Sequence, residues 1–380
     1  MEPDFPLSGT FVSSIKESCR IVTVAANIKV EDAAIRRFLE SPSFRSSFHR
    51  VSGSHGLAFP LKFPSLLSEL NLLSVLSLLN FASGYRVPLH EQTGRGAWDN
   101  IRAFTFSLYL SSATGQGDLL SAKGMKTMSE QQVAQHMGVT IHVERPHEKI
   151  PGVTVGELGG PIYELVKLIN STLTETGQIL DAAGYSELGG FVLESLKEGA
   201  KADPSASLGI VLERLVRAIP AFRDMAVVNG KPVYCFKKAL FLIHAVKIRF
   251  GSSPPFPIPS TAQAPVFTDN VLPSLLDLTG ATSHGLHELF PGAESEDKID
   301  ALLALPPEAS QAAYVLRAAA VYACEKIVEY ARGDGKNSEE QTWLKDITLP
   351  ELDIWLWAVA KDRPDYRELE RFVLRGTVFF

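Results

Sequence analysis

An aspartate at position 269 is the residue whose surroundings best suit acid–base chemistry. It ends the run Phe267-Thr268-Asp269 and precedes a short apolar stretch that begins at Val271. Carboxylates held among apolar groups are often used to transfer protons or to stabilise a developing positive charge. A second interpretation stays open, because Thr268 or Asp269 can also cap the helix that the apolar stretch predicts, with Gly280 at its end.

A glycine-rich turn is a second stretch that could contact a ligand. Residues 93–97 read Thr-Gly-Arg-Gly-Ala and precede a predicted helix, and such turns can present backbone N–H groups to an anion. The turn lacks the Lys-Ser/Thr pair of a P-loop and the spacing of a dinucleotide fingerprint. A phosphate site and a tight turn between helices are both compatible with it.

The cysteines and histidines do not form a metal-binding pattern. Cys19, Cys235 and Cys324 are far apart, odd in number and without ligand spacing. We therefore expect no metal, and buried thiols in a reducing compartment.

The composition is that of a globular protein with a sizeable core. Of the 380 residues, 45% are hydrophobic and 21% are charged, which is ordinary for a soluble protein. The net charge of −6 and the lack of a basic block argue against a grip on a polynucleotide backbone. We expect no direct tRNA or DNA binding, and a small enclosed ligand instead.

No stretch predicts a secretion signal or a membrane span. The N-terminus, Met1-Glu2-Pro3-Asp4, lacks the basic region and apolar run of a signal peptide. The most apolar stretch, residues 66–81, is short and interrupted by Ser, Glu and Asn. These features predict a soluble, cytoplasmic protein that does not contact membranes.

Apolar residues at helical spacing predict a mainly α fold with about a dozen helices. Helices are expected, among others, at residues 13–21, 30–39, 65–79, 161–182, 237–248, 306–330 and 349–360. Thr348 can cap the last of these. Residues 41–64 and 142–160 are predicted to be irregular.

A single β-hairpin is predicted beside the candidate residues. It pairs residues 225–228 with 231–236 around Asn229-Gly230, which suits the positive φ angles of a type I′ turn. The proline-rich residues 251–265 then form a stiff, extended crossing that delivers Asp269 to a fixed place. One hairpin among so many helices indicates a single compact domain.

Several short segments are informative together through their order and spacing. In the C-terminal half they are Phe222-Arg223-Asp224, Gly230-Lys231-Pro232-Val233, Phe236-Lys237-Lys238-Ala239, Phe267-Thr268-Asp269, Leu352-Asp353-Ile354-Trp355-Leu356-Trp357 and Phe379-Phe380. Looser matches are Leu79-Asn80-Phe81, Gly96-Ala97-Trp98 and Glu175-Thr176-Gly177. The chain resembles the queuosine salvage family, the queuosine-5′-phosphate N-glycosidases, over about residues 65–380. Residues 1–64 would then be N-terminal helices and a variable loop packed on this catalytic domain.

The resemblance implies a helical fold similar to helix-hairpin-helix DNA glycosylases. It implies a monomeric hydrolase that cleaves the N-glycosidic bond of queuosine 5′-monophosphate and releases queuine for tRNA modification, without metal or cofactor. The family's essential acid corresponds to Asp269. Lys237 and Asp353 correspond to residues of the ligand pocket.

The remaining candidates each have two interpretations. Lys237 can meet the 5′-phosphate or be a solvated helix residue, and Asp353 can accept a substrate hydrogen bond or pair with a cation. The aromatic candidates can stack on the base or belong to the core: they are Phe267, Trp357, Phe81 and Trp98. Asn80 and Arg317 are substrate-binding candidates through the resemblance. For Asp224, support of the hairpin is favoured over catalysis.

Departures from the family pattern concern base recognition. Ala82-Ser83-Gly84 follows Phe81 where relatives carry aromatic residues, and Val315-Leu316 precedes Arg317 in place of an expected acid. Two alternative functions therefore stay open. One is a related nucleoside or nucleotide N-glycosidase with another base preference, and the other is a non-catalytic helical nucleotide-binding protein.

The chemistry that the resemblance implies needs a well-held carboxylate. Cleavage of an N-glycosidic bond passes through a ribosyl cation-like state, which a carboxylate near C1′ stabilises. A 7-deazapurine has carbon in place of N7, so the base cannot be activated by protonation there. Asp269 suits this demand.

Overall fold

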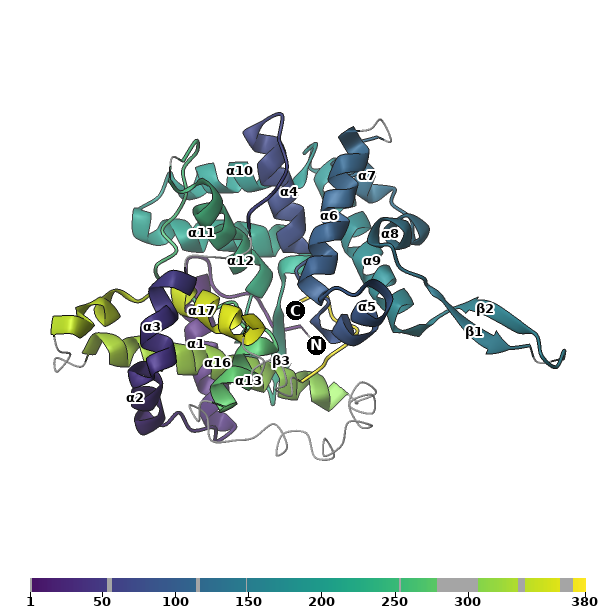
Figure 1. Cartoon of the computed structure of the whole chain (residues 1–380). Coiled ribbons are helices and arrows are strands. Elements are labelled where there is room, and N and C mark those ends of the chain that lie inside the picture. The colour runs from purple at the N-terminus through teal and green to yellow at the C-terminus, as the bar shows by residue number, and fades with distance from the viewer. Residues whose placement is uncertain are drawn as a thin grey trace. The chain divides into compact units, whose positions relative to one another are not determined.

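The computed structural model describes residues 2–52, 57–113, 117–147, 149–252, 254–278, 307–333, 339–362 and 372–380. These residues form mainly α-helices with two small antiparallel sheets (Figure 1). The predicted mainly α class is confirmed.

The chain divides into two compact units, where the sequence predicted a single compact domain. One unit contains residues 1–61, 196–216 and 223–374, and the other contains residues 62–195, 217–222 and 375–380. Each unit is assembled from separate stretches, so no single linker marks the division in the sequence.

The unit that contains residues 62–195 is built on helices and one extended hairpin. Its elements are α4 (Leu66–Leu78), η1 (Ser83–Tyr85), α5 (Arg86–Thr93), α6 (Ala97–Ala113), α7 (Ala122–Lys126), α8 (Glu130–Met137), β1 (His142–Pro146), β2 (Thr154–Leu158), α9 (Gly160–Ala182), the start of α10 (Leu188–Gly199) and η2 (Pro220–Phe222). α4 is buried on all sides from Leu70 onward, because apolar residues occur on every face of the helix and its interruptions there are the small or hydrogen-bonded Asn71, Ser74 and Ser77.

The prediction that residues 142–160 are irregular was wrong for β1 (His142–Pro146) and β2 (Thr154–Leu158). β1 pairs with β2 in an antiparallel ribbon, with His142 opposite Leu158 and Pro146 opposite Thr154. Nearly all of its side chains are exposed, and Figure 1 shows it extending away from α8 and α9. Without a buried face, the strands carry no apolar alternation for the sequence to reveal.

Within the described ranges, no single helix is long and apolar enough to cross a membrane. The bent pair Leu66–Leu78 and Ser83–Thr93 reaches that standard by length and composition alone.

The unit that contains residues 223–374 holds most of the candidate residues. Its elements are α1 (Phe11–Ala25), α2 (Asp32–Glu40), α3 (Pro42–Val51), α11 (Pro204–Ala218), β3 (Met225–Val228), β4 (Lys231–Tyr234), α12 (Lys237–Phe250), α13 (Val271–Leu278), α16 (Pro307–Gly333), η4 (Glu339–Asp346) and α17 (Leu349–Asp362). α16 is the central helix, contacted by α1, α2, α13, α17 and β3. Its alanines favour the helical backbone and let its neighbours approach closely.

The prediction that residues 41–64 form a loop was wrong over its first half, where α3 lies. The Ser41 hydroxyl accepts a hydrogen bond from the Phe44 N–H at 3.3 Å, and Pro42 takes the first helical position. Phe44 and Phe48 lie one turn apart and are buried, and Phe44 contacts the ring of Trp355 on α17. This tertiary contact stabilises a short, polar helix that its own sequence only weakly favours.

The predicted turn chemistry is confirmed at two places beside the candidate residues. Asn229 and Gly230 both have positive φ angles, 48° and 76°, in the two-residue turn of the β3–β4 hairpin. Thr348 caps α17 reciprocally with Glu351, whose carboxylate accepts from the Thr348 N–H at 2.9 Å.

Candidate active site

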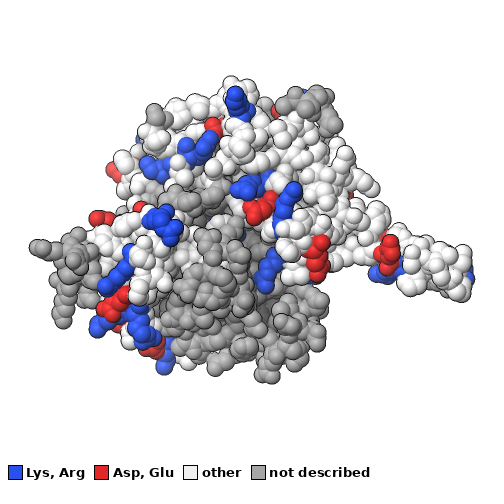
Figure 2. Space-filling model, in the orientation of Figure 1, with Lys and Arg blue, Asp and Glu red and all other residues white. Residues whose placement is uncertain are grey.

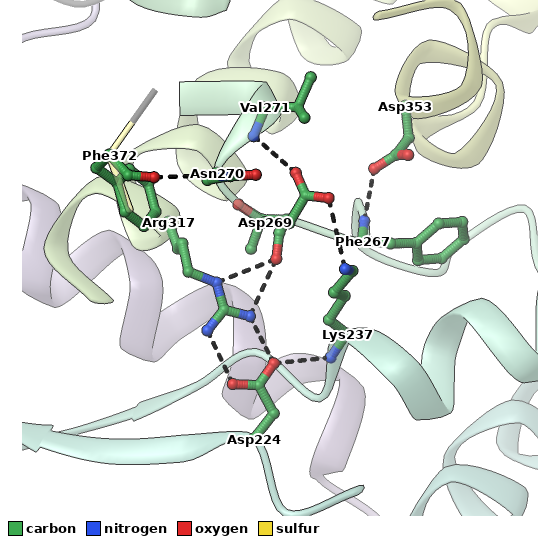
Figure 3. Close-up of polar contacts among 10 residues, drawn as sticks. Asp224, Lys237, Phe267, Asp269, Asn270, Val271, Arg317, Asp353 and Phe372 are labelled. Atoms are coloured by element: carbon green, nitrogen blue, oxygen red, sulfur yellow. Dashed lines mark hydrogen bonds and ion pairs between the residues drawn. The ribbon is translucent and has the colours of Figure 1, made fainter. Parts of the chain in front are cut away.

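Asp269 lies two residues before the first residue of α13, Val271, and contacts two different partners (Figure 3). Its Oδ1 accepts a hydrogen bond from the Val271 N–H at 2.8 Å. Its Oδ2 lies 3.4 Å from the Lys237 Nζ, and only 10% of the Asp269 side chain is exposed. One oxygen therefore caps the helix and the other belongs to a nearly buried ion pair. The predicted helix end at Gly280 lies outside the described residues.

Lys237 owes its position to the turn between β4 and α12. Phe236 adopts a left-handed conformation, with φ 46° and ψ 35°, directly before the helix starts at Lys237. A non-glycine residue in this conformation is strained and must be held by its surroundings. The Asp224 carbonyl accepts from the Phe236 N–H at 3.1 Å, and the Asp224 carboxylate accepts from the Lys237 N–H, also at 3.1 Å.

The buried environment of Lys237 disfavours its protonated form. Burial lowers the pKa of Lys237, while the nearby Asp269 carboxylate opposes that shift. Its ammonium therefore faces a carboxylate in surroundings with little water. A pair of this kind interacts more strongly than the same pair at the surface.

Asp353, on α17, brings a second carboxyl group to the same segment. Its Oδ2 accepts a hydrogen bond from the Phe267 N–H at 2.6 Å. Burial raises the pKa of Asp353 to about 7, the Phe267 N–H lowers it, and the negative charge of Asp269 raises it further. At neutral pH the protonated and the ionised form of this carboxyl group are therefore both populated.

Arg317 and Asp224 form an ion pair in which neither side chain is exposed. The two guanidinium Nη atoms donate to the Asp224 carboxylate oxygens at 2.9 and 2.5 Å. Nε and Nη2 also donate to the Thr268 carbonyl, at 3.1 and 3.0 Å. Arg317 is thus bonded to protein groups, which favours a supporting role over the substrate contact that the sequence predicted. The supporting role expected for Asp224 agrees with this geometry.

The aromatic candidates on this unit differ in exposure. The Phe267 ring is 4% exposed and contacts Phe241 and His244, so its surroundings are those of a core residue. Burial lowers the pKa of that histidine to about 4. Trp357 is half-buried, one turn beyond Asp353 on α17, and is the better placed of the two for stacking.

Asn80, Phe81 and Trp98 belong to the unit that contains residues 62–195. Phe81 is buried, whereas Asn80 and Trp98 are half-buried. Their roles in substrate binding stay predictions.

The glycine-rich turn at residues 93–97 connects α5 to α6. Gly94 ends α5 in a left-handed conformation with φ 69°. The Asn100 side chain donates to the carbonyls of Arg95 and Gly96, both at 3.1 Å. The interpretation as a tight turn between helices is confirmed, and anion binding there stays a prediction.

The link from Arg317 to Thr268 is the part of the site that the sequence did not reveal. Arg317 is separated from Asp224 by 93 positions and from Thr268 by 49, and no local pattern joins residues so far apart. Among the described residues, no three His, Cys, Asp or Glu side chains are grouped so that they could hold a metal ion.

This arrangement can support acid–base chemistry on one bond of a bound substrate. It combines a carboxylate fixed by a backbone N–H, an ammonium beside it and a second carboxyl group whose pKa is about 7. Such a set can stabilise a cation-like transition state and activate water.

Comparison with known protein families identifies a match. The family model described as queuosine salvage protein matches residues 161–379, a stretch that includes Lys237, Asp269, Arg317 and Asp353. No curated protein matches the chain.

Proposed function

This chain belongs to the queuosine salvage protein family, and we propose that it is an N-glycosidase that hydrolyses queuosine 5′-monophosphate and releases queuine. Family membership supports a role in queuosine salvage and a small queuosine-related substrate. The observation that carries the specific reaction is the nearly buried pair of Lys237 and Asp269, with Asp353 of α17 bonded to the Phe267 N–H two residues before Asp269.

In the proposed reaction, a water oxygen bonds to C1′ of the ribose while the bond from C1′ to the base nitrogen breaks. Asp269 orients this water, stabilises the positive charge that develops on the sugar and accepts the proton that the water loses. The departing base nitrogen takes up one proton from solvent, and Asp269 returns the proton from the water to solvent, so that the carboxylate is regenerated. The Lys237 ammonium lies 3.4 Å from the Asp269 Oδ2, and the Val271 N–H bonds to Oδ1 and restricts rotation of the carboxylate.

The chemistry of a 7-deazapurine makes the carboxylate important. Because carbon replaces N7, the base cannot leave after protonation at that position, and more of the barrier must be lowered on the sugar side. A carboxylate in surroundings with little water stabilises a cation more strongly than one in bulk solvent.

We assign Asp353 to substrate binding through the carboxyl oxygen that the Phe267 N–H does not hold. Its pKa of about 7 allows it to accept or donate a hydrogen bond to the sugar or base. Trp357 on the same helix is proposed to stack on the base. Lys237 is proposed to act mainly on Asp269, with the 5′-phosphate as its second target.

The proposed enzyme acts without a metal or organic cofactor, as a monomer, on the free nucleotide and not on tRNA. The net charge of −6 supports the last point. Figure 2 shows Lys and Arg interspersed with Asp and Glu over the described part of the face in view. The three cysteines are free and buried, which suits the reducing cytoplasm in which we place the protein.

The decisive experiment is incubation of the purified protein with queuosine 5′-monophosphate and, separately, with queuosine, with chromatographic detection of free queuine. We expect release, and release only from other bases would indicate a glycosidase of different preference. Tight binding of the nucleotide without any release would identify a nucleotide-binding protein. If the folded protein neither binds the nucleotide nor releases a base, the proposal is refuted.

A further inference from the structure

The buried ion pair of Arg317 and Asp224 is bonded to the backbone of Lys237 and to that of Thr268, the residue before Asp269. Asp224 accepts from the N–H of Lys237 at 3.1 Å. Arg317 donates twice to the carbonyl of Thr268, the residue that precedes Asp269. Figure 3 shows Asp224 below Lys237 and bonded to its backbone nitrogen, with Arg317 between Asp224 and the segment that carries Asp269.

We propose that Arg317 and Asp224 are positioning residues that set the separation between the Lys237 ammonium and the Asp269 carboxylate. The inference rests on the proposed function, because the geometry matters most if these two groups act on a substrate. It replaces the expected contact between Arg317 and substrate by an action through Thr268.

The geometry depends on the planar fork of an arginine. The guanidinium satisfies both carboxylate oxygens of Asp224 and the Thr268 carbonyl at once. A lysine keeps the charge but presents a single nitrogen without fixed directions, so it cannot make the same set of bonds.

Asp224 in turn shapes the backbone from which Lys237 projects. Its carbonyl accepts from the N–H groups of Cys235 and Phe236, at 2.9 and 3.1 Å. These bonds hold Phe236 in its left-handed conformation, with φ 46°. The Tyr314 hydroxyl donates to the Asp224 Oδ1 at 3.0 Å and adds a contact from α16. The start of α12 and the segment before α13 thus share one rigid support.

If the pair only stabilised the fold, its disruption would lower stability and leave the turnover of the folded protein unchanged. If the pair positions the reacting groups, its disruption lowers kcat even in molecules that are fully folded, because misplacement of reacting groups by about 1 Å can cost about 100-fold in rate. The two roles are separable by a matched pair of variants on the same helix.

The test compares Arg317→Lys with Ile327→Ala at a temperature where both proteins are folded. Ile327 is fully buried on α16, and its truncation destabilises by opening a cavity. We expect Arg317→Lys to lower kcat about 10- to 100-fold with little change in KM. Ile327→Ala should retain the wild-type kcat despite its lower Tm. Equal kcat values in the two folded variants would overturn the proposal.

A double variant covers the case in which Arg317→Lys does not fold. Asp224→Asn with Arg317→Gln removes both buried charges together, which is less destabilising than leaving one of them unpaired. The expected result is a folded protein whose kcat stays low. A wild-type kcat in this double variant would overturn the proposal.

A second measurement separates this inference from the proposed function. The Asp353 carboxyl group, titrated by carbon NMR, reports its distance from the Phe267 N–H and from the charge of Asp269. If Arg317 positions this segment, the titration midpoint shifts in Arg317→Lys and stays unchanged in Ile327→Ala. A wild-type protein that releases no queuine but shows this contrast would refute the reaction and support the positioning. An unchanged midpoint in Arg317→Lys would refute the positioning.

Discussion

Asp269 serves a helix and, in the proposed reaction, a substrate, through different oxygens of one carboxyl group. The bond from Val271 to Oδ1 leaves Oδ2 directed toward Lys237. A helix cap is therefore no argument against catalysis, because fixing one oxygen orients the other. The interpretation from the sequence already allowed both roles for one carboxylate, and in the structure the two oxygens have separate partners.

Replacement of Asp269 by asparagine should remove the reaction while it preserves the cap. The amide keeps an oxygen for the Val271 N–H but cannot carry the negative charge that a cation-like transition state requires. We expect queuine release to fall about 10²- to 10⁴-fold, measured by chromatography at saturating nucleotide.

The matched control for this change is Asp203→Asn. The Asp203 Oδ1 accepts from the Ser205 N–H at 2.9 Å, in the same geometry before α11, and the residue is exposed. This variant should release queuine at the wild-type rate. A similar loss in both variants would show that the caps, and not the charge of Asp269, matter.

Asp353 should make stability depend on pH in an unusual direction for an aspartate. Its pKa is about 7 in the folded protein and about 3.9 in an unfolded chain. Between these values the folded state holds one more proton, so the free energy of unfolding falls as pH rises from about 4 to about 7. Above the folded pKa the loss is complete.

Asp353→Asn should therefore reduce this pH dependence. We expect the ratio of its free energy of unfolding at pH 5 to that at pH 8 to be smaller than in the wild type, measured by urea denaturation. Identical pH profiles for the two proteins would show that Asp353 has the same pKa in the folded and unfolded states.

At the scale of elements, a substitution in the turn of the β3–β4 hairpin tests whether the positive φ angle there requires glycine. Gly230 has a φ of 76° and nothing lies within 4 Å of a Cβ placed there, so an alanine meets only backbone strain. Gly230→Ala should cost about 1–2 kcal/mol in unfolding free energy.

The same substitution at Gly209 should have the opposite sign. Gly209 lies within α11, without a positive φ and with nothing within 4 Å of an added Cβ. Gly209→Ala should raise the unfolding free energy by about 0.5–1 kcal/mol. Both predictions are checked by thermal unfolding of the two variants. If the two substitutions changed the unfolding free energy equally, the type I′ turn would be excluded as the reason for glycine at position 230.

Elements with strong local signals were predictable, and those that depend on distant contacts were not. Asn229-Gly230, the cap at Thr348 and Pro161 near the start of α9 are each legible from a few adjacent residues. α3 was missed because its stability comes from Phe44 against Trp355. The β1–β2 ribbon was missed because its strands have no buried face.

At the scale of the whole molecule, the charge balance bears on the choice between nucleotide and tRNA. A net charge of −6 provides no general attraction to a polyanion. Excess bulk tRNA should therefore leave the rate of queuine release unchanged at physiological salt. Inhibition that disappears at high salt would instead reveal a basic surface, and would contradict the proposed preference for the free nucleotide.

The mainly α class and the hairpin before Lys237 were predictable from the residues of the chain, and the family resemblance proposed Asp269, Lys237 and Asp353 as a group. Such features depend on periodicity, turn chemistry and short motifs, which neighbouring residues specify among themselves. Tertiary structure decided how those residues meet. It placed Lys237 against Asp269, set the pKa of Asp353 through burial, and joined Arg317 to Asp224 and Thr268. Burial and charge pairing arise when segments that are distant in the sequence pack together, so they cannot be predicted from any one stretch of the sequence.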